Sequence, residues 1–373
     1  MRPFIKWPGG KSGEIGSIKD FIPDFDRYIE PFFGGGALFF YLEPQRSAIN
    51  DISPLLMDFY GLVRERDPLF RSLLLCYDRC FSLLYELCGN YYGDIRSLYG
   101  RFFVHDIDEE DLRSELSSFV LPLCGRLLSD PESGIILDEK AFAAALSSSA
   151  HNKIKRIASY NAKKLFPEKD IKKSLIAGFM SGFYKYFRDI YNLIASGQDS
   201  ALVPQYRAAN FYFIREYCYG SMFRYNSGGA FNIPYGGISY NTKRLSSKIE
   251  SMFSEKAAAL LGSADLSCCD FERFLDKVKP GKRDFIFLDP PYDSDFSDYE
   301  GRSFDRSDQR RLAALLEKMS AQIMLVIEKT GFIQELYYDR GFNIRSFGSR
   351  YTYNVKSRNE RAAEYLMITN FPV

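Results

Sequence analysis

The chain has 373 residues, which is enough for two domains or for one domain with a large insertion. Its formal net charge of +1 excludes a uniformly basic protein, so any surface for a polyanion has to be local. The chain has seven cysteines without a C-x-x-C pair and only two histidines, which argues against a metal site and a disulfide framework. It has no apolar run of about 18 residues, which argues against a membrane span. The N-terminus also lacks the apolar core of a signal peptide, so we expect a cytoplasmic protein with free thiols, no metal and no membrane partner.

Short apolar runs that end in turn residues alternate with helical stretches near both ends of the chain. The runs occupy residues 27–33, 47–51, 264–271, 284–289, 322–328, 342–347 and 363–371. This alternation is typical of an α/β fold. We therefore predict a doubly wound, mostly parallel sheet of about seven strands, with an antiparallel end formed by the last two.

Residues 76–261 differ, because their apolar residues recur at helical spacing without strand-like alternation. We predict a large, mostly helical insertion here and assign residues 1–75 and 262–373 to one domain. Within the insertion, acids dominate residues 106–139, whereas lysines and arginines interleaved with aromatic residues dominate residues 153–188. The basic stretch fits a phosphate backbone and equally fits a solvated helix face paired with the acids.

Two glycine-rich loops resemble phosphate-binding loops without completing either motif. WPGGKS (7–12) ends like a P-loop, but Ile5 stands where that loop needs its first glycine. EPFFGGGALFF (30–40) has Gly34 and Gly36 in the spacing of a dinucleotide fingerprint, but Phe39 takes the third glycine position. Asp51 follows about twenty residues after the loop begins, where α/β sheets place an acid that accepts two ribose hydroxyls. We therefore expect a nucleoside without phosphates, held by glycine backbone and carboxylates.

The apolar strand at 284–289 ends in Asp289, Pro290, Pro291 and Tyr292. A carboxylate and a proline carbonyl form a pair of acceptors that can grip both N–H bonds of an exocyclic adenine amine and aim its lone pair at a sulfonium methyl group. The prolines fix φ and offer no N–H, and the tyrosine offers a flat face to an extruded base. An ordinary strand-ending turn is the alternative, and the neighbouring motifs favour methylation.

Five segments resemble the Dam-like DNA adenine-N6 methyltransferases (D12 class, alpha group). They are FIKWPGGK (4–11), IEPFFGGGALFF (29–40), IND (49–51), FRYNSGGAFNIPYGG (223–237) and FLDPPY (287–292). The resemblance implies a Rossmann-like methyltransferase sheet, S-adenosylmethionine as cofactor, and methyl transfer to N6 of a flipped adenine in double-stranded DNA, in a bacterial or phage setting. A cognate restriction endonuclease stays open as a second partner.

The resemblance also implies roles for individual residues. The catalytic residues would be Asp289, Pro290, Pro291 and Tyr292. The cofactor-binding residues would be Trp7, Lys11, Glu30, Phe32, Gly34, Asp51, Asp270 and Asp289. The DNA-binding residues would be Lys6, Arg224, Tyr225, Asn226, Asn232, Pro234 and Tyr235, most of them in a recognition hairpin at about residues 220–240. Arg224 suits bidentate contact with guanine, and Lys6 suits a guanine acceptor or a phosphate.

The chain departs from the family pattern in three places. Gly237, Ile238 and Ser239 stand where GATC-specific enzymes carry base-contacting side chains, which argues against a GATC target. Residues 76–205 are longer than in compact relatives, and Glu328 and Lys329 replace a usual Ser-Asn pair. An adenine methyltransferase for RNA or single-stranded DNA, and a non-catalytic DNA-binding regulator with the same fold, are the alternative functions.

Overall fold

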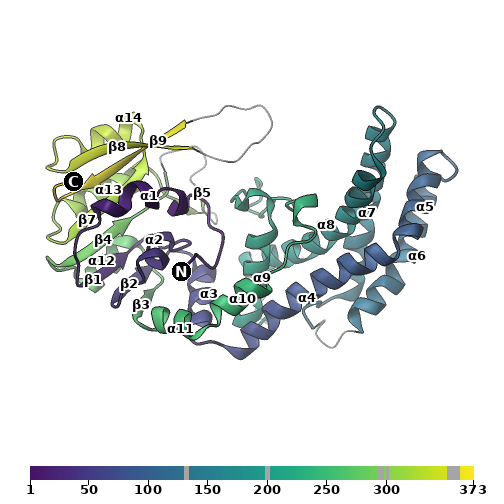
Figure 1. The fold of residues 1–373 in the computed structure, drawn as a ribbon, viewed down its shortest axis with the longest axis horizontal. Coiled ribbons are helices and arrows are strands. Elements are labelled where there is room, and N and C mark those ends of the chain that lie inside the picture. The colour runs from purple at the N-terminus through teal and green to yellow at the C-terminus, as the bar shows by residue number, and fades with distance from the viewer. Residues whose placement is uncertain (130–133, 198–201, 293–297, 300–301, 351–361) are drawn as a thin grey trace. The chain divides into compact units, whose positions relative to one another are not determined.

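The computed structural model describes residues 1–129, 134–197, 202–292, 298–299, 302–350 and 362–373 (Figure 1). The chain forms two compact units. The first comprises Met1–Arg66, Phe223–Gly229 and Met252–Val373, and the second comprises Asp67–Met222 and Ala230–Ser251. The predicted boundary at 75/76 lies inside helix α4 (Pro68–Asn90). This helix begins earlier because the Asp67 side chain accepts a hydrogen bond from the Phe70 amide (2.8 Å) and Pro68 fits the first helical position.

A seven-stranded sheet forms the centre of the first unit, in the order β3-β2-β1-β4-β7-β9-β8. Its strands are β1 (Arg27–Glu30), β2 (Ser47–Asn50), β3 (Ala264–Ser267), β4 (Asp284–Leu288), β7 (Gln322–Glu328), β8 (Asn343–Arg350) and β9 (Ala362–Thr369). The first five are parallel, and β9 runs antiparallel to both neighbours. The predicted α/β class, the seven strands and the antiparallel end are confirmed, and the sheet is Rossmann-like.

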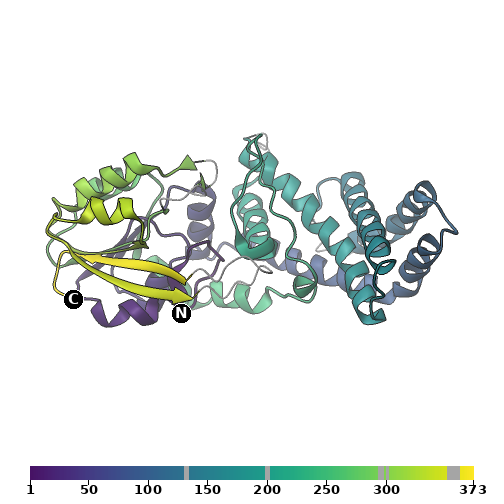
Figure 2. The same cartoon turned by 90° about the horizontal axis from the view of Figure 1, so that it is seen from above.

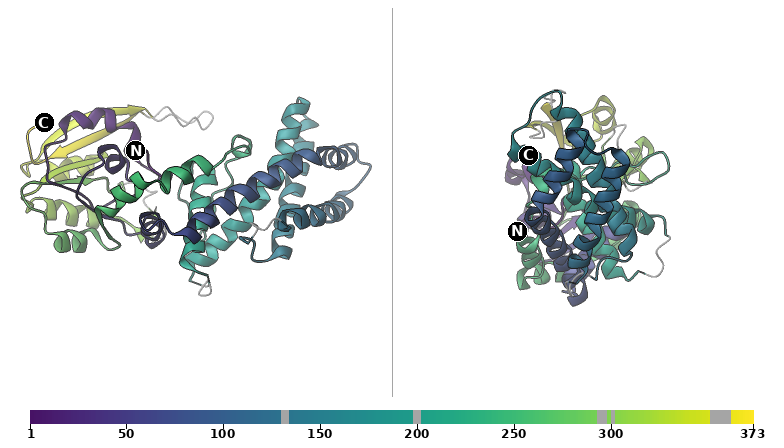
Figure 3. Two further views of the ribbon diagram at one scale, coloured as in Figure 1. Left: turned by 60° about the horizontal axis from the view of Figure 1, so that its bottom comes forward. Right: turned by 90° about the vertical axis from the view of Figure 1, so that its right-hand side faces the viewer.

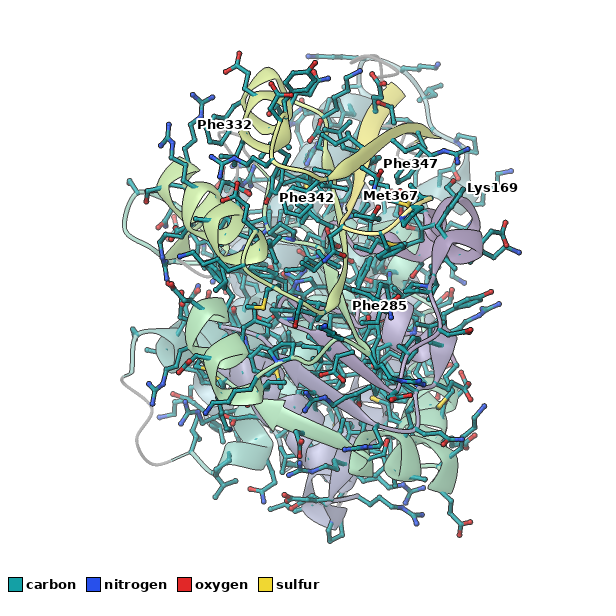
Figure 4. All side chains as sticks on the ribbon, turned by 90° about the vertical axis from the view of Figure 1, so that its left-hand side faces the viewer. Lys169, Phe285, Phe332, Phe342, Phe347 and Met367 are labelled. Atoms are coloured by element: carbon teal, nitrogen blue, oxygen red, sulfur yellow. The ribbon has the colours of Figure 1, made fainter. Side chains whose placement is uncertain are left out.

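Burial explains why the central strands read as continuous apolar runs. Every residue of β2 and β4 is buried, as expected for parallel strands covered on both faces. Figure 4 labels Phe285 of β4 inside the unit, and Phe347 and Met367 on the adjacent strands β8 and β9. Lys329, which departs from the family pattern, follows the last residue of β7. Its ammonium group donates a hydrogen bond to the Glu364 carboxylate of β9 (2.8 Å) and so links the two strands.

The remaining elements of the first unit are short. They are the helices α1 (Ile15–Ile18), α2 (Ala37–Leu42), α3 (Pro54–Arg64), α11 (Glu255–Gly262), α12 (Phe271–Val278), α13 (Arg306–Leu316) and α14 (Gly331–Tyr337), the 3₁₀ turns Lys11–Gly13 and Lys19–Phe21, and the strand pair β5 (Asp298–Tyr299) and β6 (Arg302–Ser303). Helix α10 (Ser246–Met252) spans the boundary between the units.

Helices dominate the second unit, as predicted for the insertion. Besides α4 they are α5 (Tyr92–Phe103), α6 (Glu109–Leu128), α7 (Glu139–Asn161), α8 (Glu168–Ala195) and α9 (Pro204–Tyr217), with 3₁₀ turns at Tyr219–Ser221 and Ile238–Tyr240. Figures 2 and 3 show α7 and α8 side by side. Glycines permit this close approach, because a Cβ on Gly182 would lie 2.6 Å from the Cα of Leu146.

The predicted recognition hairpin contains short bridges rather than a regular strand pair. Cys218 and Tyr235 form an isolated antiparallel bridge, and the Tyr219 amide donates to the Pro234 carbonyl (2.8 Å). Tyr225 and Phe231 are also bridge residues, and between them the Gly229 amide donates to the Asn226 carbonyl (2.9 Å) in a turn.

The basic stretch divides between the two interpretations that the sequence left open. Lys155 pairs with Glu109 (2.6 Å) and Lys185 with Asp189 (2.8 Å), as expected for a salt-bridged helix face. By contrast, Lys163, Lys164 and Lys169 are exposed around the turn between α7 and α8, and no ion pair joins them to another described residue.

Neither a membrane span nor a metal site is found among the described residues. No helix in these parts of the chain has the length and apolar character needed to cross a membrane. No group of three or more histidine, cysteine, aspartate or glutamate side chains there has the arrangement of a metal site.

Candidate active site

A cavity of about 280 Å³ lies in the first unit where β1, β2 and β4 end. Its lining comes from residues 7–11, 30–37, 50–53, 269–271, 287 and 289–292, together with Phe304 and Asp308. Parallel strands bring their carboxyl ends to one edge of the sheet, which is why loops far apart in the sequence meet here. All of the predicted catalytic and cofactor-binding residues line this cavity.

Trp7 and the glycine loop pack so closely that side chains are excluded from the loop. Gly34 has φ of 48°, and a Cβ there would lie 2.6 Å from Cδ1 of Trp7. Gly36 has φ of 63°, and its Cβ would lie 2.5 Å from the Phe33 ring. The other side of Trp7 meets Phe223 edge-on, with ring centroids 5.0 Å apart. The glycines therefore shape the cavity wall and place its tryptophan.

Two neighbouring residues at the end of β2 fix the loops around the cavity. The Asp51 carboxylate accepts hydrogen bonds from the amides of Gly34 (2.8 Å) and Ser53 (3.0 Å). The Asn50 side chain donates to the carbonyls of Pro31 (3.0 Å) and Cys269 (2.9 Å). Asn50 was not predicted as a site residue, although it stands inside the IND segment that carried part of the resemblance.

Lys11 is buried against the Asp-Pro-Pro-Tyr segment, with a side chain that is 1% exposed. Its ammonium group donates to the Asp289 carboxylate, to the Tyr292 hydroxyl (2.5 Å) and to the Gly9 carbonyl (3.1 Å). Burial raises the pKa of Asp289, and the adjacent Lys11 charge opposes that rise. The lysine therefore both orients this carboxyl group and favours its ionised form.

Glu30 adds a third acid to the cavity beside the buried Asp51 and the half-buried Asp289. Burial raises the pKa of Glu30 well above its ordinary value, and the two neighbouring carboxylates raise it further. The Tyr28 hydroxyl donates to Glu30 (2.8 Å), which opposes the rise. Burial also raises the pKa of Asp51, against the stabilising amides described above. Three acids around one ammonium group give a cavity suited to a cationic ligand.

Aromatic rings form another part of the cavity wall. The Phe32 ring lies 5.4 Å from that of Phe271 and meets the Phe304 ring edge-on at 5.6 Å. Asp270 caps α12 through the Glu272 amide (3.0 Å) and accepts a hydrogen bond from Arg311 (3.0 Å). Phe271 and Phe304 were not predicted. Phe271 was signalled by its place directly after Asp270, whereas no motif marks Phe304.

The predicted DNA-binding residues stand apart from the described lining of the cavity. In the first unit, Arg224 and Asn226 are exposed, while Lys6 and Tyr225 are half-buried. The others belong to the second unit: Pro234 is exposed, Asn232 is half-buried and Tyr235 is buried.

Tyr235 has a structural role within the second unit. Its hydroxyl donates to the Asn241 side chain (3.0 Å), and its ring packs against Tyr184 and Phe81. This side chain therefore holds the end of the hairpin segment against the helices.

Comparisons with known proteins agree with this geometry. A family model described as "D12 class N6 adenine-specific DNA methyltransferase" matches residues 7–119 and 145–353. The chain is 27% identical to the type II methyltransferase M.MjaIII of Methanocaldococcus jannaschii, over 100% of this chain and 99% of that protein. It is 23% identical to the type II methyltransferase M.CviBI of Paramecium bursaria Chlorella virus NC1A over the full length of both. It is 22% identical to the DNA adenine methylase of Haemophilus influenzae, over 90% of this chain and 82% of that protein.

The contact between Gly34 and Trp7 gives a direct test of the cavity wall. We expect Gly34→Ala to lower the free energy of unfolding by about 1–3 kcal/mol, because the new methyl group overpacks the indole and φ is positive there. Trp7 is the only tryptophan in the chain, so its emission should shift to the red and acrylamide should quench it more strongly. Gly13→Ala is the control, since a Cβ there meets nothing within 4 Å. Unchanged stability and emission in Gly34→Ala would contradict the described packing.

Proposed function

This chain belongs to the D12 class of N6 adenine-specific DNA methyltransferases, and from that premise we propose that it methylates a flipped adenine at a specific site in double-stranded DNA, with S-adenosylmethionine as donor. The observation that carries the proposal is the convergence of separate segments of the chain on one cavity, with Asp-Pro-Pro-Tyr at its rim. We propose the first unit as the catalytic domain and the second as the one that contributes target recognition.

The chemistry of the cavity fits S-adenosylmethionine. When bound, this donor supplies an electrophilic methyl group on a cationic sulfonium. The acids Glu30, Asp51 and Asp289 match a ligand with positive charges and ribose hydroxyls. The rings of Phe32 and Phe271 offer apolar faces to an adenine. The predicted roles of Trp7, Lys11, Gly34 and Asp270 follow from their places in the same lining.

The Asp-Pro-Pro-Tyr segment would hold the target amine. The Asp289 carboxylate and the Pro290 carbonyl accept its two N–H bonds, which concentrates electron density on N6 and orients the lone pair. The Lys11 charge opposes the rise in the pKa of Asp289 and so favours the ionised carboxylate, which acts as an acceptor. Tyr292 supplies the face on which the flipped base stacks. Asp289 is then the nearest group able to accept the proton that the amine loses after transfer.

Exposed side chains of the hairpin segment would read the DNA sequence. Arg224 can contact a guanine edge with two hydrogen bonds, and Lys6 can contact a guanine or a phosphate. Gly237, Ile238 and Ser239 do not supply the long polar side chains of GATC-specific enzymes, so we propose a different target. Relatives named type II methyltransferases favour a cognate restriction endonuclease as a partner in the cytoplasm.

The turn between α7 and α8 is our candidate for an additional contact with the DNA backbone. Lys163, Lys164 and Lys169 are exposed there, next to Leu165, which is 80% exposed, and Phe166, which is 39% exposed. Exposed lysines of this kind can neutralise phosphates and release counterions. Such a contact would give the long insertion a role in DNA affinity.

Substitution of Asp289 tests its proposed role as the catalytic acid. We expect Asp289→Ala to reduce methyl incorporation from labelled S-adenosylmethionine into duplex DNA by about a thousandfold or more, because the amine then has only one of its two acceptors. Asp265→Ala, which removes an exposed acid from β3, is the matched control. Full activity of Asp289→Ala would refute the proposed chemistry.

The same assay separates the alternative functions. Faster methylation of RNA or single-stranded DNA than of duplex DNA would change the substrate, and binding of DNA without any methylation would favour the non-catalytic regulator. Base-resolved sequencing of the product identifies the target, and a GATC result would contradict the inference from residues 237–239.

The second prediction concerns pH. Because the pKa of Glu30 is raised, a proton competes with a cationic ligand in the cavity, and a bound cation favours release of that proton. We expect affinity for S-adenosylmethionine to rise as the pH increases through this raised pKa, with proton release in calorimetry across buffers of different ionisation enthalpy. Glu30→Gln should bind more weakly and lose most of the pH dependence. S-adenosylhomocysteine, which lacks the sulfonium charge, is the comparison ligand, and an equal pH dependence for both ligands would oppose this account.

The third prediction concerns salt. Replacing Lys163, Lys164 and Lys169 together by glutamine should reduce the slope of log affinity against log salt by about 0.9 for each phosphate that the variant no longer neutralises. Binding should weaken equally for target and non-target duplexes, since backbone contacts carry no sequence information. The control replaces Lys277, Lys279 and Lys282 by glutamine, which removes the same charge from the other unit. Equal slopes in the two triple variants would refute a DNA contact at this turn.

A further inference from the structure

We propose that Gln309 of α13 is a positioning residue for the Asp-Pro-Pro-Tyr segment, a role that rests on the proposed function. The Gln309 side chain is fully buried. Its amide nitrogen donates to the carbonyl oxygen of Pro291 at 2.8 Å. This bond joins a helix that carries no family motif to the centre of the catalytic segment.

The segment needs such a bond because its prolines cannot donate hydrogen bonds. The last pairing of β4 with β7 joins Leu288 to Leu325, so the sheet does not hold the residues beyond it. Pro290 and Pro291 have no N–H, which leaves their carbonyls and the flanking side chains as the available points of attachment. Lys11 holds Asp289 and Tyr292 at the two ends, and Gln309 holds the carbonyl between them.

Helix α13 is a rigid base for this glutamine. Asp305 caps the helix by accepting hydrogen bonds from the amides of Ser307 (2.7 Å) and Asp308 (3.2 Å), in a capping box. Leu312 and Leu316, one and two turns further on, lie in the core of the first unit. The helix therefore cannot follow the catalytic segment if that segment moves.

The amide oxygen of Gln309 indicates that the stability of the fold alone does not explain why a glutamine stands here. Its Oε1 is buried and makes no hydrogen bond to the described residues. An unpaired buried acceptor destabilises a fold, so an apolar side chain of similar length would suit the core better. A glutamine is needed here if its function is to hold the Pro291 carbonyl by a hydrogen bond.

The functional consequence follows from the geometry of the chain. The proline rings fix φ at two successive residues, so rotation about ψ of Pro291 is a main remaining freedom of the segment. The bond to the carbonyl restricts that rotation, which orients the peptide plane that leads into Tyr292 and so the place of its ring. Gln309 would therefore govern the rate of methyl transfer and the stacking of the flipped base, and have little influence on donor binding.

Arg311, on the same helix, provides a contrasting variant. Its guanidinium donates to Asp270 (3.0 Å), Glu272 (2.8 Å) and Asp308 (2.7 Å), and lies 4.9 Å from the centre of the Phe271 ring. These contacts concern the part of the cavity assigned to the donor. Arg311→Gln should therefore raise KM for S-adenosylmethionine, whereas a change at Gln309 should lower kcat.

The test compares Gln309→Met, which keeps the length of the side chain and removes its amide, with Gln334→Met at an exposed position of α14. We expect Gln309→Met to lower the single-turnover methylation rate by about tenfold or more, with donor affinity within about twofold of wild type. Donor affinity is followed by the emission of Trp7. With 2-aminopurine at the target position, the fluorescence of the flipped base should change, because Tyr292 no longer stacks on it in the same orientation.

Each outcome supports or overturns the inference. A wild-type methylation rate in Gln309→Met would show that Gln309 has no positioning role. A variant in which the rate, the donor affinity and the melting temperature all fall together would show the same. If this variant does not fold, Gln309→Glu, which keeps the volume, is measured in the same way and read by the same criteria. Failure of the wild-type enzyme to methylate any DNA would refute the proposed function itself, which is a distinct result.

Discussion

The buried ammonium group of Lys11 is the interaction on which the arrangement of the site depends. It comes from a loop near the N-terminus and bonds to two residues of a segment that follows β4. A buried ion pair adds little net stability, because desolvation offsets much of the attraction, but removing one partner leaves an uncompensated charge. The pair therefore specifies geometry. It holds the loop of Trp7 and the Asp-Pro-Pro-Tyr segment in one arrangement around the cavity.

The groups around the cavity favour ligand binding and lower the stability of the folded chain without a ligand. Three acids face it, and burial raises the pKa of each. These raised pKa values mean that ionising the acids destabilises the folded chain before a ligand binds. They agree with a site that receives a positively charged donor, since such a ligand relieves the repulsion between the carboxylates. Gln309, whose buried Oε1 makes no hydrogen bond to the described residues, belongs to the same pattern, in which local cost coincides with the position of a functional group.

Much of this fold could be predicted from the sequence because its signals are local. The run DFIFLD (284–289) predicted a buried strand, and the observed strand spans Asp284–Leu288. The motifs at the strand ends predicted which residues meet, since the topology of a parallel sheet requires their convergence. Other features depend on contacts between distant residues. Neither Gln309 nor Phe304 stands in a motif, and only the folded chain brings Phe304 to the cavity wall and Gln309 to the Pro291 carbonyl. Likewise, the hairpin signal did not reveal that the segment contains isolated bridges rather than regular strands.

The segment Phe223–Gly229 links the proposed DNA-reading residues to the proposed donor site. Although the flanking residues belong to the helical unit, this segment belongs to the catalytic unit, and Phe223 packs against Trp7. Trp7 in turn packs on Gly34, whose amide is bonded to Asp51. A continuous path of contacts thus runs from the residue before Arg224 to the acid assigned to the donor ribose. Each contact in this path is either close packing or a hydrogen bond. The Trp7 indole is therefore the structural link between the residue that precedes the proposed base-reading arginine and the loop of the proposed donor site.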